Sequence, residues 1–285
     1  QKTLRDKLIE LCRTTIRPRA AECDKEYKFP RESLDSLASL GVLGLNISKD
    51  LGGLGENYVC CAMVVETIAR YGCPSTAMIL CMHLLATTAL QFRKTETATI
   101  ISLLKDVNNK KLIGAAIFSD PVLGGYFPYD VCCKMKIFPD NTMRILKYGS
   151  FATSAGYADF YAIYSKMPVN VEGDVKYIAI LCFKNEVRAY SGDWDAMGLH
   201  GNMSGEVVID ATLPTDRIIG CLDGNTIMTE SVGITFKLLL SSGWNGVAMA
   251  CMDVAKKHVT RKYMGDVGMR VCDFPSVQDY FGRCL

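Results

Sequence analysis

The sequence lacks the residue patterns of several metal-binding classes. Its 285 residues include only three histidines, His83, His200 and His258, and their wide separation argues against a histidine-based metal cluster. None of its 13 cysteines stands in the paired CxxC spacing of a zinc site. We therefore predict no metal site and a thiol-rich protein of a reducing compartment.

Charge and hydropathy argue against two further kinds of partner. The 32 basic and 30 acidic residues leave a net charge of +2, which provides no basic face for nucleic acid. The most apolar run, 77–90, is shorter than the about 20 residues that span a bilayer, so we predict a buried core helix and no membrane span. No GxGxxG motif follows a strand-like run, which disfavours a nicotinamide-binding Rossmann fold.

Hydrophobic spacing predicts an α+β fold with three parts. Helical spacing over 4–26, 30–40, 58–71, 75–92 and 97–107 predicts an N-terminal all-helical domain, 1–110. Short runs of strand-forming residues between turn residues predict an antiparallel β domain, 111–222, with strands over 112–118, 131–138, 143–146, 159–165, 177–183 and 206–209. A long helix over 226–262 and another from Pro275 predict a C-terminal helical bundle domain, 223–285, which we expect to be incomplete at Leu285.

Several local motifs are more specific than this order of elements. The opening carries Phe29-Pro30 and the glycine loop Leu51-Gly-Gly-Leu-Gly55. Trp194-Asp-Ala-Met-Gly-Leu-His-Gly201, followed by Ser204-Gly205-Glu206, forms a distinctive strand and turn signature. Over nearly the whole chain these motifs resemble the flavin-dependent acyl-CoA dehydrogenases.

The resemblance implies an FAD site on the β domain. Phe118-Ser119 and then Gly124-Gly125 resemble the first flavin-contacting segment of the family, and Phe151-Ala-Thr153 resembles the second. A reduced flavin carries negative charge near N1, which favours hydrogen-bond donors there and an apolar wall behind the ring. Taken alone, positions 151 and 153 would be read as ordinary alternation along a strand. The expected cofactor-binding residues are Phe118, Ser119, Gly124, Gly125, Phe151, Thr153 and, reaching the FAD of a neighbouring subunit, Arg261 and Met264.

The resemblance also implies a reaction, the α,β-desaturation of an acyl-CoA thioester. A carboxylate removes the α-proton while the β-hydrogen leaves as hydride to flavin N5. One branch of the family has this base at the position of Phe236, which takes no proton; Glu230 is a substitute candidate, with a solvated first-turn acid as its other interpretation. Most members carry the base at a position that would lie beyond Leu285, so we expect either a truncated chain or a degenerate member.

Departures from the family pattern leave alternatives open. Phe151 replaces the usual Trp, and Pro275 stands where a Gln often lies near the FAD adenine. The alternatives are a catalytically inactive paralogue that acts as a binding or assembly protein, and an acyl-CoA oxidase. The resemblance further implies fatty acid metabolism, an acyl-CoA substrate, a homodimer or homotetramer, an electron-transferring flavoprotein as acceptor, and a mitochondrial matrix location in a eukaryote or a cytoplasmic one otherwise.

Overall fold

The computed structural model describes residues 1–92, 97–119, 121, 133–166, 177–190, 192, 194–220 and 224–284. The helices that precede the first strand are α1 (Lys2–Leu11), α2 (Arg17–Lys25), α3 (Arg31–Ala38), α4 (Tyr58–Tyr71), α5 (Pro74–Leu90) and α6 (Ala98–Asp106). The strands of the two large sheets are β1 (Gly114–Ile117), β2 (Cys133–Ile137), β3 (Thr142–Ala152), β4 (Phe160–Lys166), β5 (Tyr177–Phe183), β6 (Val187–Tyr190) and β7 (Gly205–Pro214). The elements that follow are α7 (Gly224–Ile227), α8 (Gly233–Arg261), β8 (Tyr263–Met264), β9 (Met269–Arg270) and α9 (Pro275–Cys284).

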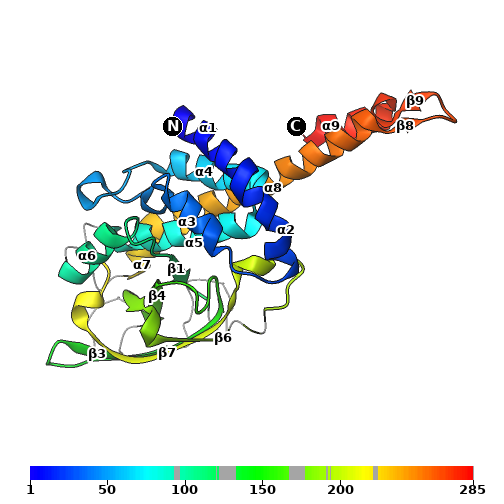
Figure 1. Ribbon diagram of the computed structural model, residues 1–285. Helices are drawn as coiled ribbons and strands as arrows, with labels where there is room; N and C mark the ends of the chain where they lie inside the picture. The colour runs from blue at the N-terminus through cyan, green and yellow to red at the C-terminus, as the bar shows by residue number, and fades with distance from the viewer. Residues whose placement is uncertain are drawn as a thin grey trace.

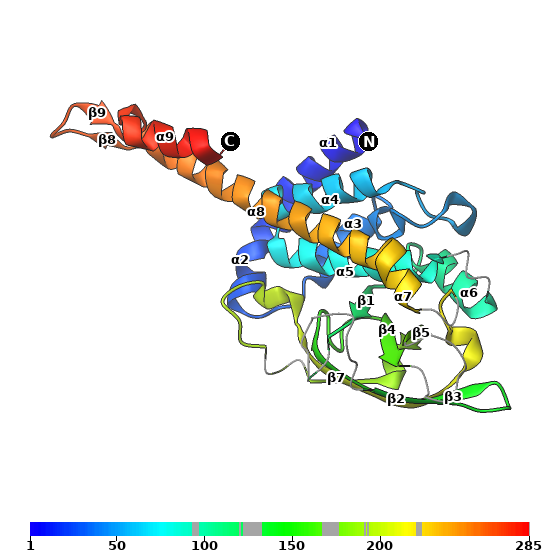
Figure 2. The same cartoon turned by 180° about the vertical axis from the view of Figure 1, so that it is seen from behind.

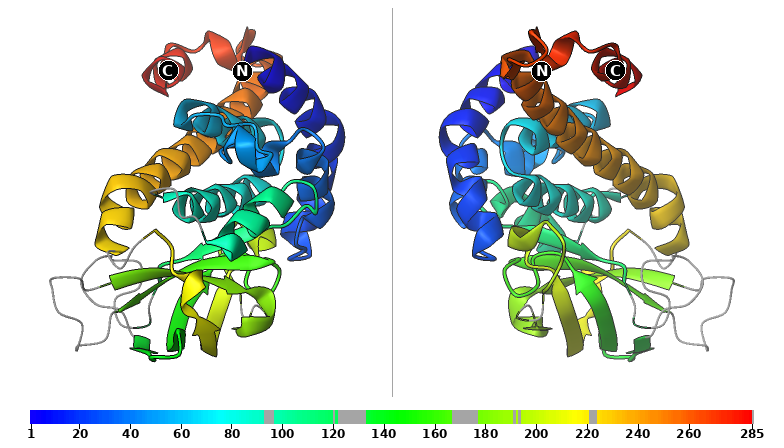
Figure 3. Two further views of the ribbon diagram at one scale, coloured as in Figure 1. Left: turned by 90° about the vertical axis from the view of Figure 1, so that its left-hand side faces the viewer. Right: turned by 90° about the vertical axis from the view of Figure 1, so that its right-hand side faces the viewer.

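These elements form a helical layer over two stacked sheets, as Figure 3 shows. The sheet next to the helices has the strand order β1-β4-β5, and the outer sheet has the order β2-β3-β7-β6. Figure 1 shows α5 directly above the first sheet, and Figure 2 shows α8 crossing the helical layer from α7. A helical part followed by a β part and a second helical part is the predicted order.

The sheet β1-β4-β5 is the middle sheet, because it lies between the helices and the outer sheet. It is apolar on both faces because each face belongs to a different hydrophobic core. Successive side chains of a strand point to opposite faces. On β5 the residues that join the helical core are Tyr177, Ala179 and Leu181. Those that join the core between the two sheets are Ile178, Ile180 and Cys182. This burial on both faces explains why the sequence of β5 is a continuous apolar run.

One strand pair departs from the predicted antiparallel sheet. β1 pairs with β4 in parallel, with Gly114 opposite Phe160 and Ile117 opposite Ile163, whereas the other pairs of the large sheets are antiparallel. Local strand propensity carries no information about pairing direction, so the prediction was wrong for this pair. β6 and the short β8–β9 hairpin were not predicted either.

The two longest helices match their predicted character. In α5 nearly every side chain is buried, which confirms the predicted core helix. No helix of the described residues is both long and apolar enough to cross a membrane. In α8 the small residue Gly246 packs against α4, since a Cβ there would lie 2.4 Å from the carbonyl oxygen of Glu66. The glycines of this helix therefore permit close packing, as predicted.

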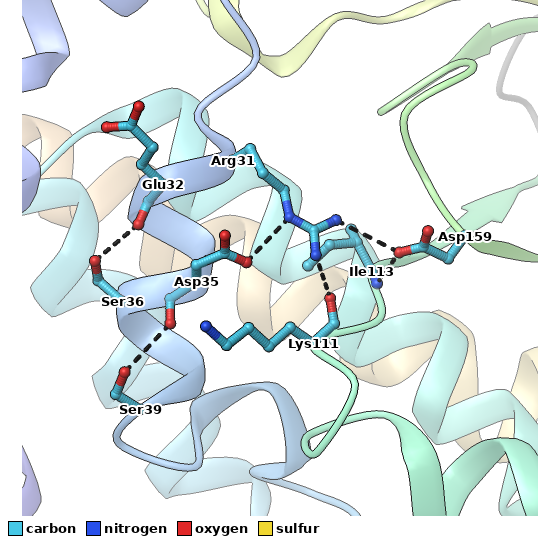
Figure 4. A network of polar contacts seen from close by, with 8 residues as sticks. All are labelled: Arg31, Glu32, Asp35, Ser36, Ser39, Lys111, Ile113 and Asp159. Carbon is cyan, nitrogen blue, oxygen red and sulfur yellow. Dashed lines mark hydrogen bonds and ion pairs between the residues drawn. The ribbon is translucent and has the colours of Figure 1, made fainter.

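A polar network joins the helical layer to the middle sheet (Figure 4). The guanidinium of Arg31 contacts Asp35 at 3.0 Å, the carbonyl oxygen of Lys111 at 2.8 Å and Asp159 at 3.6 Å. Asp159 Oδ2 also accepts the backbone N–H of Ile113 at 2.8 Å, just before β1. Asp159 thus fixes the start of β1 and the start of α3 together.

We predict that Asp159→Ala lowers the free energy of unfolding by about 1–3 kcal/mol, because it leaves the N–H of Ile113 and one side of Arg31 without their acceptor. The matched control is Asp106→Ala, which breaks only the exposed pair with Lys110 and is expected to cost about 0.5 kcal/mol or less. Urea unfolding of both variants measures the difference; equal costs would show that the network does not join the layers.

The fully buried His83 links α5 to two other elements. Its Nε2 lies 2.7 Å from the carbonyl oxygen of Leu43, and its Nδ1 accepts the N–H of Gly114 at 2.9 Å. The ring must therefore be neutral, with the proton on Nε2. Burial lowers the pKa of His83 to about 4. This is the packed histidine that the sequence predicted, rather than a metal ligand.

We predict that His83→Phe costs about 2–4 kcal/mol, because it leaves a buried acceptor and a buried donor unpaired. The folded pKa lies below the unfolded value, so the neutral ring contributes fully above about pH 6.5, and roughly 3 kcal/mol is lost as the pH falls towards 4. Urea unfolding at several pH values measures this loss. His258→Phe, at an exposed position on α8, is the control; a wild-type stability unchanged over that range would contradict the assignment.

Candidate functional site

The predicted second flavin segment forms a β-bulge at the end of β3. Gly149 pairs with Val207 and Ala152 pairs with Gly205, so β3 has one residue more than β7 over this stretch. Bulges re-aim side chains and are common beside active sites. Here Phe151 points outward and is 66% exposed, while Ala152 is buried. An exposed aromatic ring at the open edge of a bulge is a suitable wall for a flat ligand.

Ser119, from the predicted first flavin segment, is bonded to this bulge. Its Oγ accepts the backbone N–H of Phe151 at 3.0 Å, so its hydroxyl proton remains available for donation. Its carbonyl oxygen accepts a hydrogen bond of 3.1 Å from Nζ of Lys147, a fully buried lysine on β3. Sequence reasoning missed Lys147, although its inward position after Met143 and Ile145 in an alternating strand was a usable signal.

Thr153 follows the bulge and contacts the Ser204 region of the family signature. Its Oγ1 lies 3.4 Å from Oγ of Ser204, which also donates to Oδ1 of Asn202 at 2.9 Å. Oγ of Ser204 is the donor in both contacts and shares its single hydroxyl proton between them, so Thr153 accepts and its own hydroxyl proton is not used in this turn. Thr153 is 8% exposed, so it supports the site from below its surface.

Backbone strain is concentrated around these residues. Ser154, Leu199 and Met203 have positive φ angles of 60°, 59° and 48°, which side-chain-bearing residues seldom adopt. The strained turns bond to each other, because the N–H of Ser154 donates to the carbonyl oxygen of Asn202 at 2.9 Å. Such strain clusters at functional sites.

Two buried hydroxyl groups flank the bulge without a bonding partner. Oγ of Ser150 and Oγ of Ser154 make no hydrogen bond within the described ranges. A bound ligand or an ordered water is one explanation for buried polar atoms of this kind. Together with the exposed ring of Phe151 and the free hydroxyl proton of Ser119, they fit a flat ligand with several hydrogen-bond acceptors and donors, as a flavin is.

The remaining predicted cofactor residues do not join this group. Phe118 is half-buried and packs edge-on against Tyr164 at 6.5 Å, on the helical side of the sheet. Arg261 and Met264 are exposed at the end of α8 and in β8, on the arm that projects from the body in Figure 1. Their expected role concerns a neighbouring subunit and stays a prediction. Gly124 and Gly125 lie outside the described residues.

The two candidate base positions differ in their surroundings. Phe236 is half-buried against the helical core. Glu230 is exposed in the π-turn η9 (Met228–Val232) and borders a polar cleft of about 450 Å³ with Asn46, Glu56 and Thr88. A water-accessible carboxylate differs from the water-poor base that the reaction requires. The solvated first-turn interpretation of Glu230 therefore fits its environment better.

His200, within the signature, attaches this loop to α2. Its Nδ1 lies 2.8 Å from the carbonyl oxygen of Asp24, its Nε2 lies 2.6 Å from that of Ala196, and its ring stacks on Tyr27 at 4.2 Å. Because carbonyl oxygens only accept, both nitrogens donate when the ring is protonated. The carbonyl groups of Asp24 and Ala196 accordingly raise the pKa of His200.

We predict that this attachment weakens with rising pH. The folded pKa of His200 is raised, so the contribution is complete below the unfolded value of about 6.5 and is lost as the pH rises through the folded pKa. The measurement is the difference in unfolding free energy between the wild type and His200→Gln from pH 6 to about pH 9. A difference that stays constant or grows over this range would contradict the protonated ring.

The sequence of this chain is similar to those of known proteins. Residues 1–97 match the family model described as acyl-CoA dehydrogenase, N-terminal domain. The chain is 26% identical over 264 residues to the caffeyl-CoA reductase-Etf complex subunit CarC of Acetobacterium woodii, covering 90% of this chain and 66% of that protein. It is 25% identical over 284 residues to mitochondrial isovaleryl-CoA dehydrogenase of Pongo abelii, covering 94% and 64% respectively. The chain thus spans somewhat less than two thirds of the length of these relatives.

Solved structures show the same fold. Butyryl-CoA dehydrogenase from Megasphaera elsdenii superposes with a TM-score of 0.84 at 20% identity, covering 99% of this chain and 74% of that chain. A glutaryl-coenzyme A dehydrogenase complex superposes with a TM-score of 0.86 at 20% identity, covering 99% and 71%. The layered helical and β architecture is therefore that of the acyl-CoA dehydrogenases. The family model, the relatives and the solved structures all point to the acyl-CoA dehydrogenase family, which is flavin-dependent and has FAD as its standard cofactor.

Proposed function

We propose that this chain forms the FAD-binding part of an acyl-CoA dehydrogenase that desaturates an acyl-CoA thioester between its α and β carbons. The observation that carries the proposal is that Ser119, Phe151 and Thr153 lie together at one β-bulge. The proteins that share this fold include flavin-dependent oxidoreductases. The alternatives of an inactive paralogue and an oxidase have no comparable support from the structure.

Each residue of the bulge has a separate task in this proposal. The exposed ring of Phe151 supports one side of the cofactor. Ser119 offers the hydroxyl proton left free by its bond to the N–H of Phe151, and Lys147 holds the Ser119 backbone in place. Thr153 offers a second donor, held by the Ser204 turn. FAD, when bound, supplies the hydride acceptor for the β-hydrogen of the substrate.

The substrate side of the proposal requires a proton acceptor for the α-carbon. Phe236 has no ionisable group, and Glu230 is solvent-exposed, so neither meets this need. The reaction requires for this step a carboxylate held in a water-poor pocket. An electron-transferring flavoprotein is the proposed electron acceptor, because one relative is named as part of an Etf complex.

Flavin absorbance and substrate reduction test the proposal. Purified full-length chain is expected to bind FAD and to show visible flavin absorbance. Anaerobic addition of acyl-CoA thioesters of several chain lengths is expected to bleach that absorbance. A chain that stays colourless after incubation with FAD would refute the flavin site, and one that binds FAD but is never bleached would refute the desaturation reaction.

We predict that Thr153→Val weakens FAD binding roughly five- to tenfold, through the loss of one hydrogen-bond donor worth about 1 kcal/mol. Thr153→Ser should restore the binding, because it keeps the hydroxyl. Thr212→Val, at an exposed position at the far end of β7, is the matched control and should bind FAD as the wild type does. Equal FAD dissociation constants for wild type and Thr153→Val would remove Thr153 from the site.

A further inference from the structure

Two buried cysteines meet where three elements converge. Cys23 lies on α2, and Cys73 lies in the turn between α4 and α5; they are 50 residues apart, and their sulfur atoms are 4.0 Å apart. Their exposed fractions are 3% and 4%. The third element is η7 (His200–Asn202), because a Cβ on Gly201 would lie 2.1 Å from Sγ of Cys23. The pair is thus packed directly beneath the family signature loop.

Cys73 is placed where a negative sulfur is stabilised. It is the N-cap residue of α5, a helix of 17 residues whose first backbone N–H groups have no acceptor within the helix. The adjacent S–H of Cys23, followed by groups of Thr76 and Ser75, lowers the pKa of Cys73 to about 6. The same contact raises the pKa of Cys23.

The side chain of Thr76 belongs to the same surroundings of Cys73. Its side chain is fully buried on the first turn of α5, and its Oγ1 makes no hydrogen bond to another group in the described part of the chain. A buried hydroxyl proton without an acceptor suits a thiolate next to it. The geometry around Cys73 therefore provides a donor that an ordinary thiol does not need.

Three other buried cysteines of the described residues behave as ordinary buried thiols. Burial raises the pKa of Cys12, Cys61 and Cys81 to about 12 in each case, which keeps these thiols protonated and unreactive. Cys81 is the closest comparison, because it lies on the same helix as Cys73's cap position and is equally buried. Cys73 is thus distinguished by its position and its neighbour rather than by burial alone.

A small molecule can reach Cys73. The residue lines an apolar cavity of about 660 Å³ between α2, the α4–α5 turn and α8, whose wall also includes Leu199 and the exposed Cys251. Cys23 is not part of this wall and lies behind Cys73. An oxidant that enters this cavity therefore reaches Cys73 before Cys23.

We propose that Cys23 and Cys73 form a reversible dithiol–disulfide site that reacts with a hydroperoxide. In the first step the Cys73 thiolate attacks one peroxide oxygen, the O–O bond breaks, and Cys73 becomes a sulfenic acid while the other oxygen leaves and takes a proton as water or an alcohol. In the second step Cys23 attacks the sulfenic sulfur, the S–O bond breaks, and the proton of Cys23 leaves with that oxygen as water. Two electrons pass from the two sulfurs to the peroxide.

Forming the bond changes the support of the signature loop. The sulfur atoms must approach from 4.0 Å to the length of a disulfide, about 2.05 Å, which moves Cys23 relative to Gly201. The loop of Gly201 continues into Asn202 and Ser204, and Ser204 contacts Thr153. The oxidation state of the pair is therefore coupled to the bulge through packed neighbours, and this inference does not depend on the proposed reaction.

Limited oxidation of the full-length chain tests the site. The reduced protein is treated with equimolar hydrogen peroxide, remaining thiols are blocked in denaturant with N-ethylmaleimide, and peptides are identified by mass spectrometry. The expected product is a peptide pair joined by Cys23 and Cys73, which dithiothreitol separates again, with Cys81 recovered as a blocked thiol. Oxidation that begins at Cys251, or a disulfide between Cys73 and Cys251, would overturn the proposal.

Variants separate the roles of the two sulfurs. Cys23→Ser should leave Cys73 as a sulfenic acid that dimedone traps, whereas Cys73→Ser should lose the early oxidation, and Cys81→Ser should behave as the wild type does. In the wild type the rate of Cys73 oxidation should be constant above about pH 7 and should fall roughly tenfold per pH unit below pH 5. A rate that instead rises steadily up to about pH 9, as for an ordinary thiol, would show that no thiolate is stabilised. This wild-type pH profile decides the question even if a variant does not fold.

Discussion

The structure depends on a three-stranded sheet that is buried on both faces. Strands β1, β4 and β5 give alternate side chains to the helical core and to the core between the sheets, so neither the helices nor the outer sheet can shift without exposing apolar surface. Polar groups inside this sandwich must find partners there. His83 does so by joining α5 to β1 and to Leu43, and Lys147 does so by bonding to the Ser119 backbone.

This constraint explains where the candidate site lies. The outer sheet is held in register against the middle sheet, so the extra residue in β3 is accommodated by the bulge between Gly149 and Ala152 at the strand's end. The bulge turns Phe151 outward and places its N–H on Ser119, which belongs to the chain leaving β1. The site is thus built where a middle strand and an outer strand both end. Its strain, at Ser154, Leu199 and Met203, is maintained by bonds between the turns.

Much of the fold followed from the sequence because its signals are local. The helix α4 was predicted over 58–71, where Asn57 caps the first turn and apolar residues recur at helical spacing. β5 was predicted over 177–183 from its unbroken apolar run. By contrast, β6 has only four residues, and one of them is the charged Arg188. The parallel pairing of β1 with β4 joins residues that are far apart in the sequence. Neither leaves a pattern in the local sequence.

The candidate site was predictable only through resemblance. Ser119, Phe151 and Thr153 were chosen by motif, and their mutual contacts arise from long-range bonds that spacing does not reveal. Phe118 shows the limit of this method, because alternation at the end of β1 turns it towards the helical core. The left-handed conformation of Leu199 and Met203 could not be predicted from the sequence, since neither residue type favours it.

The long helix α8 has unequal support along its length. Its first half packs on α4 through Gly243 and Gly246, but beyond Gly246 every residue of the helix is half-buried or exposed. One ion pair, from Arg70 to Asp253, continues the contact with α4. A helix held at one end opens from its other end first, so hydrogen–deuterium exchange would proceed along α8 from Arg261 inward. The C-terminal end of α8 is thus connected to α4 through the glycine contact. A partner that binds this end would therefore alter the packing of α8 against α4.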